Sequence, residues 1–89
     1  MRTKEGFKLR KMAGEYIVVG EGRSRVNFNK MIVLNKTAGY LWEQVEGKDF
    51  DARTLAGLLM EQYEIDEPTA LRDSEALAAK WVEAGIAEE

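Results

Sequence analysis

Hydrophobic residues alternate with polar ones in the first third of the chain and follow a helical repeat in the rest. Phe7 and Leu9 alternate with charged residues, and Met12 is a further candidate for the buried side, so this stretch is expected to be a strand. Residues 15–19 are rich in β-branched and aromatic side chains and predict a second strand. The turn signal Ala13-Gly14 between them indicates a tight hairpin.

A third strand is expected further along the chain. A polar, glycine-bearing loop occupies residues 20–25, and a short strand is expected at residues 26–28. Met31–Leu34 is a continuous apolar run between Lys30 and Asn35, and we interpret it as the third principal strand. Its periodicity does not distinguish a buried central strand from an edge strand that binds a partner.

Three helices are predicted after the strands. Asn35, Asp51 and Asp66 are good N-cap residues, because their side-chain oxygens can accept hydrogen bonds from backbone N–H groups of the first turn. Gly47 is expected to end the first helix and Gly85 the third. The third helix carries one apolar stripe, which consists of Leu71, Ser74, Leu77, Ala78, Trp81 and Val82.

The order of the elements predicts the fold class. Strands come first and helices follow, which is typical of an α+β domain, and 89 residues suit a single domain over residues 1–89. Two helices joined by a tight turn beside a small sheet are typical of a winged helix-turn-helix. Trp42 and Trp81 lie on apolar helical faces, where core packing is the expected role.

The composition narrows the chemistry that the chain can perform. It contains no cysteine and no histidine, which excludes disulfides, thiolate nucleophiles and the commonest general base and metal ligand. No nucleophile–base pair and no glycine-rich phosphate loop is visible. We therefore expect a protein that is not an enzyme and that uses no metal and no cofactor.

The N-terminus and the hydropathy bear on the compartment. Met1 is followed by basic and polar residues without the apolar segment of a signal peptide. No stretch reaches the roughly 20 apolar residues that a membrane span needs. The expected location is the cytoplasm, without a membrane partner.

The charges are unevenly distributed along the chain. Residues 1–30 carry eight basic and three acidic groups, whereas residues 31–89 carry five basic and thirteen acidic groups. Arg23, Arg25 and Lys30 are read in two ways, as solvated loop charges or as groups that steer an acidic partner electrostatically.

Several segments together resemble one known family. The run FNKMIVLNKTAGYLWE at residues 28–43 is similar to the central signature of the PqqD family, in which a strand that ends in Leu-Asn passes directly into a helix that carries Leu-Trp. The hairpin at residues 9–19, the YEID junction at residues 63–66 and the EAGI ending at residues 83–86 also resemble that family. The similarity covers about residues 5–88.

This resemblance implies a function and a site. The family, also called the RiPP recognition element after ribosomally made and post-translationally modified peptides, has a winged-helix-like fold. It binds the leader segment of a precursor peptide and presents it to a modifying enzyme, often a radical S-adenosylmethionine enzyme. The leader is expected to add as an extra strand beside the third helix, on a peptide-binding set that consists of Met31, Ile32, Val33, Leu34, Leu71, Ser74, Leu77 and Ala78. The pathway, pyrroloquinoline quinone synthesis or another, stays open.

Two other interpretations remain at this point. A winged helix-turn-helix can bind DNA, but the third helix offers only Arg72 and Lys80 as basic groups against five acidic ones. Nucleic-acid binding is therefore the weaker alternative, and it would depend on the basic loop that contains Arg23 and Arg25. An exposed apolar strand edge would also permit a homodimer.

Overall fold

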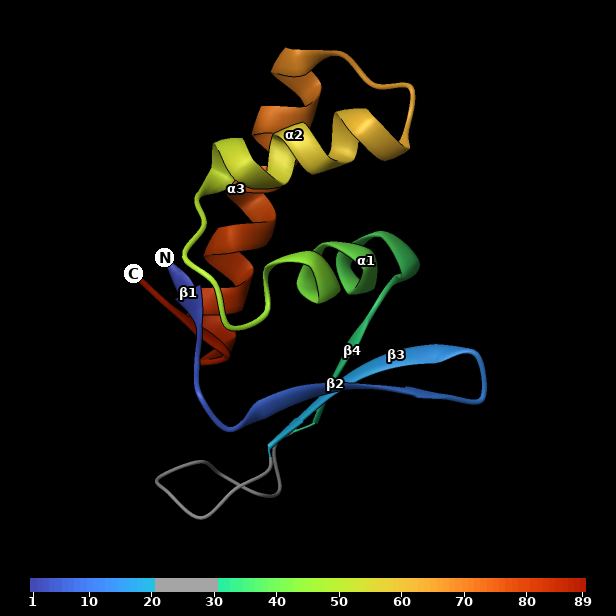
Figure 1. Ribbon diagram of the computed structural model, residues 1–89, viewed down its shortest axis with the longest axis vertical. Coiled ribbons are helices and arrows are strands. Elements are labelled where there is room, and N and C mark those ends of the chain that lie inside the picture. Colours follow the sequence, from blue (N-terminus) through green and yellow to red (C-terminus); the bar gives the residue numbers. More distant parts are fainter. Residues whose placement is uncertain (21–30) are drawn as a thin grey trace.

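The computed structural model of the protein describes residues 1–20 and 31–89. Three helices gather on one side of a three-stranded antiparallel sheet (Figure 1). The elements, in chain order, are β1 (Arg2–Thr3), β2 (Phe7–Met12), β3 (Glu15–Gly20), β4 (Met31–Leu34), α1 (Lys36–Val45), α2 (Ala52–Gln62), α3 (Glu67–Ala84) and β5 (Ala87–Glu88). The predicted order of three principal strands followed by three helices is confirmed, whereas the strand expected at residues 26–28 lies outside the described residues.

The hairpin between β2 and β3 has the predicted two-residue turn. Met12 pairs with Glu15 across it, and Ala13 and Gly14 both have positive φ values, 51° and 81°. Two successive residues with positive φ make a turn whose twist matches that of the flanking strands. The expectation that Met12 faces the core is wrong, because its side chain is 47% exposed on the face opposite Phe7 and Leu9.

Each helix begins at its predicted N-cap. The side chains of Asn35, Asp51 and Asp66 accept hydrogen bonds from the backbone N–H groups of Ala38, Thr54 and Thr69, at 2.7, 2.8 and 3.0 Å. These bonds satisfy donors that a helix start otherwise leaves without a partner. At the other end of α3, Gly85 adopts the left-handed conformation that closes a helix.

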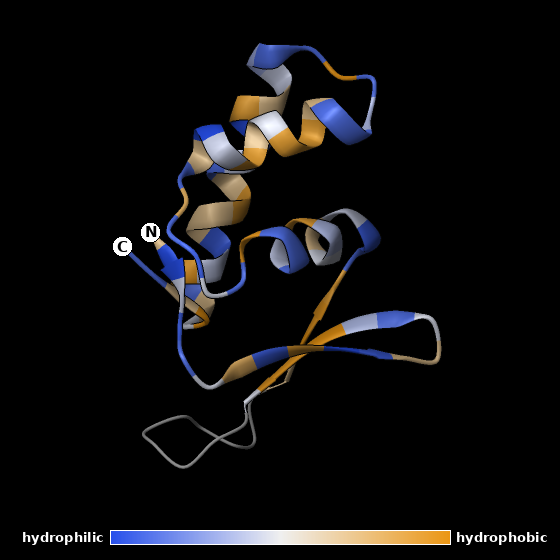
Figure 2. Cartoon of the chain, in the orientation of Figure 1, coloured by the Kyte–Doolittle hydropathy of each residue, from blue (hydrophilic) through white to orange (hydrophobic). Residues whose placement is uncertain are grey.

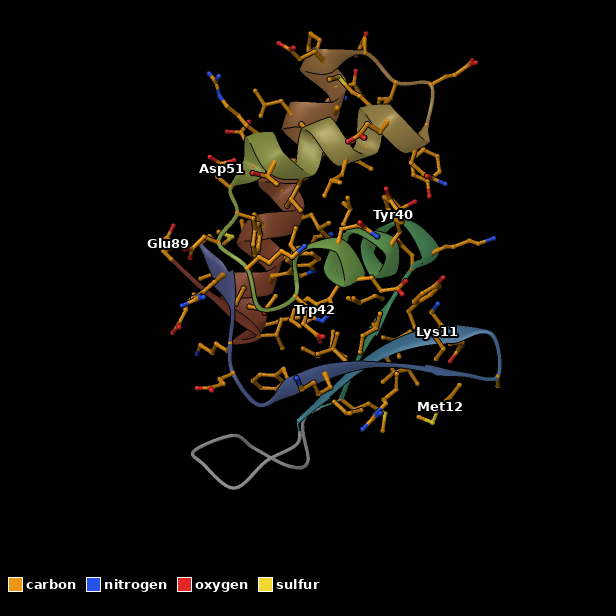
Figure 3. The ribbon with its side chains drawn as sticks, in the orientation of Figure 1. Lys11, Met12, Tyr40, Trp42, Asp51 and Glu89 are labelled. Atoms are coloured by element: carbon orange, nitrogen blue, oxygen red, sulfur yellow. The ribbon has the colours of Figure 1, made fainter. Side chains whose placement is uncertain are left out.

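The core lies between the helices and the inner face of the sheet. Trp42 and Trp81 are 0% and 2% exposed and meet edge to face at 5.2 Å, which confirms their predicted packing role. Figure 3 shows Trp42 directed from α1 towards the sheet. Hydrophobic residues line the inward sides of the helices and run along β3 and β4 (Figure 2).

A second, smaller sheet joins the two ends of the described chain. β1 pairs antiparallel with β5, in the register Arg2–Glu88 and Thr3–Ala87. Sequence patterning did not predict it, because two-residue strands are too short to show alternation. Among the described residues, no helix is long and apolar enough to cross a membrane.

Candidate functional site

The two edges of the three-stranded sheet differ in what covers them. On the β2 edge, the Glu46 carboxylate accepts hydrogen bonds from the backbone N–H of Leu9 at 3.3 Å and from Trp42 Nε1 at 3.0 Å. On the β4 edge, no hydrogen bond reaches the strand from its outer side within the described chain. Within the described chain, the whole outer side of β4 therefore offers backbone groups of the kind that recruit another strand, whereas on β2 Glu46 occupies the outward N–H of Leu9.

The bond to Leu9 fixes the direction of every backbone group in the sheet. Because the Leu9 N–H points away from β3, the pair of Leu9 with Val18 is a pair without mutual hydrogen bonds. Val18 then directs its N–H and C=O towards Ile32 of β4. Hydrogen-bonding directions alternate along a strand, so the N–H and C=O groups of Met31 and Val33 point outward, to the free edge.

The side chains of β4 divide between two faces. Met31 and Val33 are each 60% exposed on the face turned away from the helices. Ile32 is half-buried and Leu34 is buried, and both pack against the core on the helical side. An edge strand with apolar side chains on both faces is a surface that a second strand would cover.

A cleft lies on the helical side, beyond the C-terminal end of β4. It has a volume of about 460 Å³, and α1, α2, α3 and their connections contribute to its walls. Its lining residues are Asn35, Thr37, Ala38, Leu41, Leu59, Tyr63, Ile65, Asp73, Ala76, Leu77 and Lys80. The aliphatic residues among them provide an apolar floor, while Asp73 and Lys80 bring one charge of each sign from α3. Such a lining suits an apolar group with polar contacts around it.

A second hollow flanks the same end of the strand. It has a volume of about 570 Å³ and lies at the tip of the hairpin, where Tyr16, Val33 and Leu34 contribute to its walls. Asn35 lines both hollows, so the end of β4 opens on each side of the residue that caps α1. The hollow beside β1 is smaller, about 290 Å³, and is lined mainly by charged residues and glycine, with Phe7 as its one large apolar residue.

The residues predicted on the third helix occupy different places. Leu77 lines the cleft, and Leu71 is half-buried against the core. Ser74 and Ala78, in contrast, are 0% and 5% exposed, because they belong to the stripe through which α3 packs against the core. In this conformation, neither has a surface from which to touch a ligand. This placement departs from the expected groove wall of Leu71, Ser74 and Leu77.

Sequence reasoning missed most of the cleft. Asp73, Ala76 and Lys80 were not predicted to line a peptide site, yet their spacing with Leu77 defines one edge of α3 next to the core stripe. Tyr63 was noted in the YEID junction but not as a site residue; its hydroxyl lies 3.5 Å from Thr37 Oγ1, across the mouth between α2 and α1. The steering residues Arg23, Arg25 and Lys30 lie outside the described residues.

The described part of the chain holds no cluster of three acidic side chains that could bind a metal ion. The perturbed carboxyl groups belong to the helix starts and not to the cleft. Hydrogen bonds from the Thr54 backbone and hydroxyl lower the pKa of Asp51 below its ordinary value, and bonds from the Thr69 hydroxyl and backbone do the same for the pKa of Asp66. These shifts mark helix caps.

The fold and the edge define a small winged-helix-like α+β domain with one open strand beside a cleft. The family model described as coenzyme PQQ synthesis protein D (PqqD) matches residues 15–87. The chain therefore belongs to the PqqD family, and the resemblance noted in its sequence is confirmed. A comparison with curated protein sequences found no match.

Two solved structures share the fold over nearly the whole chain. The structure described as TbiB1 in complex with the TbiA(beta) leader peptide superimposes with a TM-score of 0.77 at 16% identity, over 99% of this chain and 95% of that one. The structure described as lasso peptide synthetase B1 complexed with the leader peptide gives a TM-score of 0.74 at 23% identity, over 99% and 96%. Both confirm the predicted α+β architecture.

Proposed function

We propose that this chain is a non-catalytic peptide-binding protein that captures the leader segment of a ribosomally made precursor peptide and presents it to a modifying enzyme. The observation that carries the proposal is that the backbone groups of Met31 and Val33 point outward at the β4 edge, which no described residue covers. Membership of the PqqD family and a fold shared with two proteins solved with leader peptides support it.

The open edge suits capture by strand addition. An added strand obtains its affinity from main-chain hydrogen bonds, so it needs no catalytic side chain from the receiving protein. We expect the peptide to run antiparallel to β4, as all neighbours in this sheet do. Its N-terminal end then lies near Asn35 and the cleft, and its C-terminal end lies near Met31.

The cleft is the proposed source of specificity. An antiparallel peptide that pairs with Met31 and Val33 reaches the cleft with a residue on the N-terminal side of the paired stretch. An apolar side chain there would contact Leu77 and the other aliphatic residues of the floor. Asp73 and Lys80 would select polar neighbours of that side chain by charge.

The remaining parts of the proposal concern partners and place. The modifying enzyme is proposed to be a separate protein, with a radical S-adenosylmethionine enzyme as the first candidate. Pyrroloquinoline quinone synthesis is one pathway among several that use such peptides. We propose that the domain acts in the cytoplasm without a metal or cofactor of its own.

No observation favours the DNA-binding alternative. The exposed positions of α3 include Glu67, Asp73, Glu75 and Glu83 against Arg72 and Lys80. A recognition helix with this excess of carboxylates would be repelled by phosphates.

A titration with a matched pair of variants tests the proposal. The amide resonances of the domain would be followed as leader peptides from neighbouring reading frames are added, and separately as duplex DNA is added. Val33→Pro removes one outward N–H, and an edge strand tolerates proline there because that N–H faces solvent. We expect saturable shifts along β4 with a peptide and at least a tenfold loss of affinity in Val33→Pro, roughly 1.4 kcal/mol.

The matched control is Lys8→Ala. Lys8 lies on the outer face of β2, two strands from the proposed site, and its backbone groups are not at the β4 edge. The affinity of the Lys8→Ala variant for the peptide should equal that of the unmodified chain. A Val33→Pro variant that folds and binds the peptide with unchanged affinity would contradict strand addition, and shifts with DNA alone would contradict the function.

A further inference from the structure

We infer that β4 also pairs with β4 of a second copy of this chain, so that a peptide-free dimer covers the same edge that a peptide would occupy. The pairing itself follows from the geometry of the strand. The competition with peptide rests on the proposed function.

The register of the pairing follows from the outward groups. In an antiparallel arrangement with Ile32 on the two-fold axis, Met31 lies opposite Val33 of the partner subunit, and Val33 lies opposite Met31 of the partner subunit. In each of these two pairs, the residues form two N–H···O=C hydrogen bonds with each other. The outward N–H and C=O groups of Met31 and Val33 therefore all gain a partner. Ile32 forms the pair without mutual hydrogen bonds at the centre.

The side chains permit this pairing. Met31, Ile32, Val33 and Leu34 carry no charge, so no like charges face each other across the axis. Met31 and Val33 are each 60% exposed in the single chain. In the dimer, each would be partly covered on the outer face by the side chain opposite it in the partner subunit. Lysine, proline or a bulge, the usual devices against edge pairing, are absent from the described strand.

The contrast between the two sheet edges favours an assembly of two chains. On β2, Glu46 accepts from the outward N–H of Leu9, and the strand carries three basic residues, which disfavour pairing at that edge. Pairing between identical open edges is isologous and closes after a single contact, whereas two open edges would allow a fibre. A four-residue strand makes a small interface, so the dimer should be weak and should yield to a longer peptide that also fills the cleft.

The chain offers a clean test, because it contains no cysteine. In the proposed register, Ile32→Cys places two thiols opposite each other on the axis, at a pair whose Cα atoms lie about 4.5 Å apart, a separation that a disulfide spans. Met31→Cys is the matched control, because it faces Val33 of the partner subunit and not its own copy. Met31 is also far more exposed than Ile32, so random collisions would favour the control.

We expect Ile32→Cys to form a disulfide-linked dimer several-fold faster than Met31→Cys under mild oxidation, and a leader peptide to slow it. Sedimentation velocity of the unmodified chain, over a roughly hundred-fold concentration range, should show a dimer that the peptide dissociates. Equal or slower cross-linking of Ile32→Cys, or a monomer throughout, would overturn the dimer.

The two proposals fail separately. Peptide binding without the Ile32→Cys dimer would overturn the dimer and leave the proposed function intact. A dimer that forms in this register and persists at saturating peptide would overturn the claim that the dimer and the peptide occupy the same edge. A larger oligomer would overturn the closed, two-fold arrangement.

Discussion

The Glu46 side chain accepts a hydrogen bond from the backbone N–H of Leu9, 37 positions earlier in the chain, at 3.3 Å. The same carboxylate oxygen accepts from Trp42 Nε1 at 3.0 Å. One residue at the end of α1 thus occupies an outward N–H of the β2 edge and orients a core indole. This contact makes the two edges unequal, and the proposed function depends on that inequality.

Replacing Glu46 by alanine should therefore destabilise the fold and expose the β2 edge. Two donors lose their acceptor, and we expect the free energy of unfolding to fall by about 2 kcal/mol, measured by urea denaturation. Glu46→Gln is the control, because its amide oxygen can still accept both bonds and should preserve most of the stability. An alanine variant as stable as the unmodified chain would show that the contact contributes nothing.

Gly39 should not tolerate a side chain, although alanine has the better helix propensity. A Cβ on Gly39 would lie 2.8 Å from Tyr16 Cβ and would overlap its ring, so α1 would have to move away from β3. A propensity gain of about 1 kcal/mol opposes an overpacking cost of about 1–3 kcal/mol. We expect Gly39→Ala to lower the thermal midpoint.

Gly57 provides the control for that substitution. It lies within α2, and a Cβ there would meet nothing within 4 Å. Only the propensity gain applies, so Gly57→Ala should stabilise the chain by up to about 1 kcal/mol. Opposite shifts of the two midpoints are expected, and a stabilising Gly39→Ala would contradict the close approach of α1 and β3.

A substitution of Ser74 distinguishes a buried core position from one that contacts the peptide. The Ser74 Oγ is buried without a hydrogen-bond partner in the described structure, so its desolvation is not compensated. Ser74→Ala should leave stability unchanged or raise it by up to about 1 kcal/mol, and peptide affinity should not change. A loss of peptide affinity with unchanged stability would restore Ser74 to the binding surface.

The helix caps should make the fold sensitive to acid. Hydrogen bonds hold the pKa values of Asp51 and Asp66 in the folded chain below the ordinary value of 3.8. The contribution of each group is therefore present above that value and is lost as the pH falls through the lower, folded pKa. Unfolding measured at a series of pH values should show stability decreasing below about pH 4.

Asp66→Asn separates the capping hydrogen bond from the ionisation of the carboxyl group. Asparagine retains an oxygen that can accept from the Thr69 N–H but does not ionise in this range. The variant should lose less stability than the unmodified chain between neutral pH and pH values below 4. Identical pH profiles would mean that Asp66 does not contribute to the acid response.

The sequence predicted those parts of the fold that local patterns encode. Asn35, Asp51, Asp66 and Gly85 each occupy the predicted end of a helix, because capping depends on one side chain and the next turn of backbone. The Ala13-Gly14 turn likewise follows from neighbouring residues. The family resemblance rested on such local segments taken in order.

The parts that the sequence did not predict depend on contacts between distant residues. Apolar periodicity on α3 identified the buried stripe but not the cleft edge of Asp73 and Lys80, whose neighbours come from α1 and α2. Ser74 shares the spacing of the stripe. The pattern was interpreted as a groove wall, but in the structure Ser74 lies in the core. The covering of β2 by Glu46 required the folded chain.

Amide hydrogen exchange along β4, with and without a leader peptide, tests the central claim most directly. We predict an alternating result: the amides of Met31 and Val33 gain protection on binding, because their N–H groups point outward. Those of Ile32 and Leu34, which already face β3, change little. Protection that spares Met31 and Val33, or that appears only in the helices, would contradict capture of the peptide as an added strand.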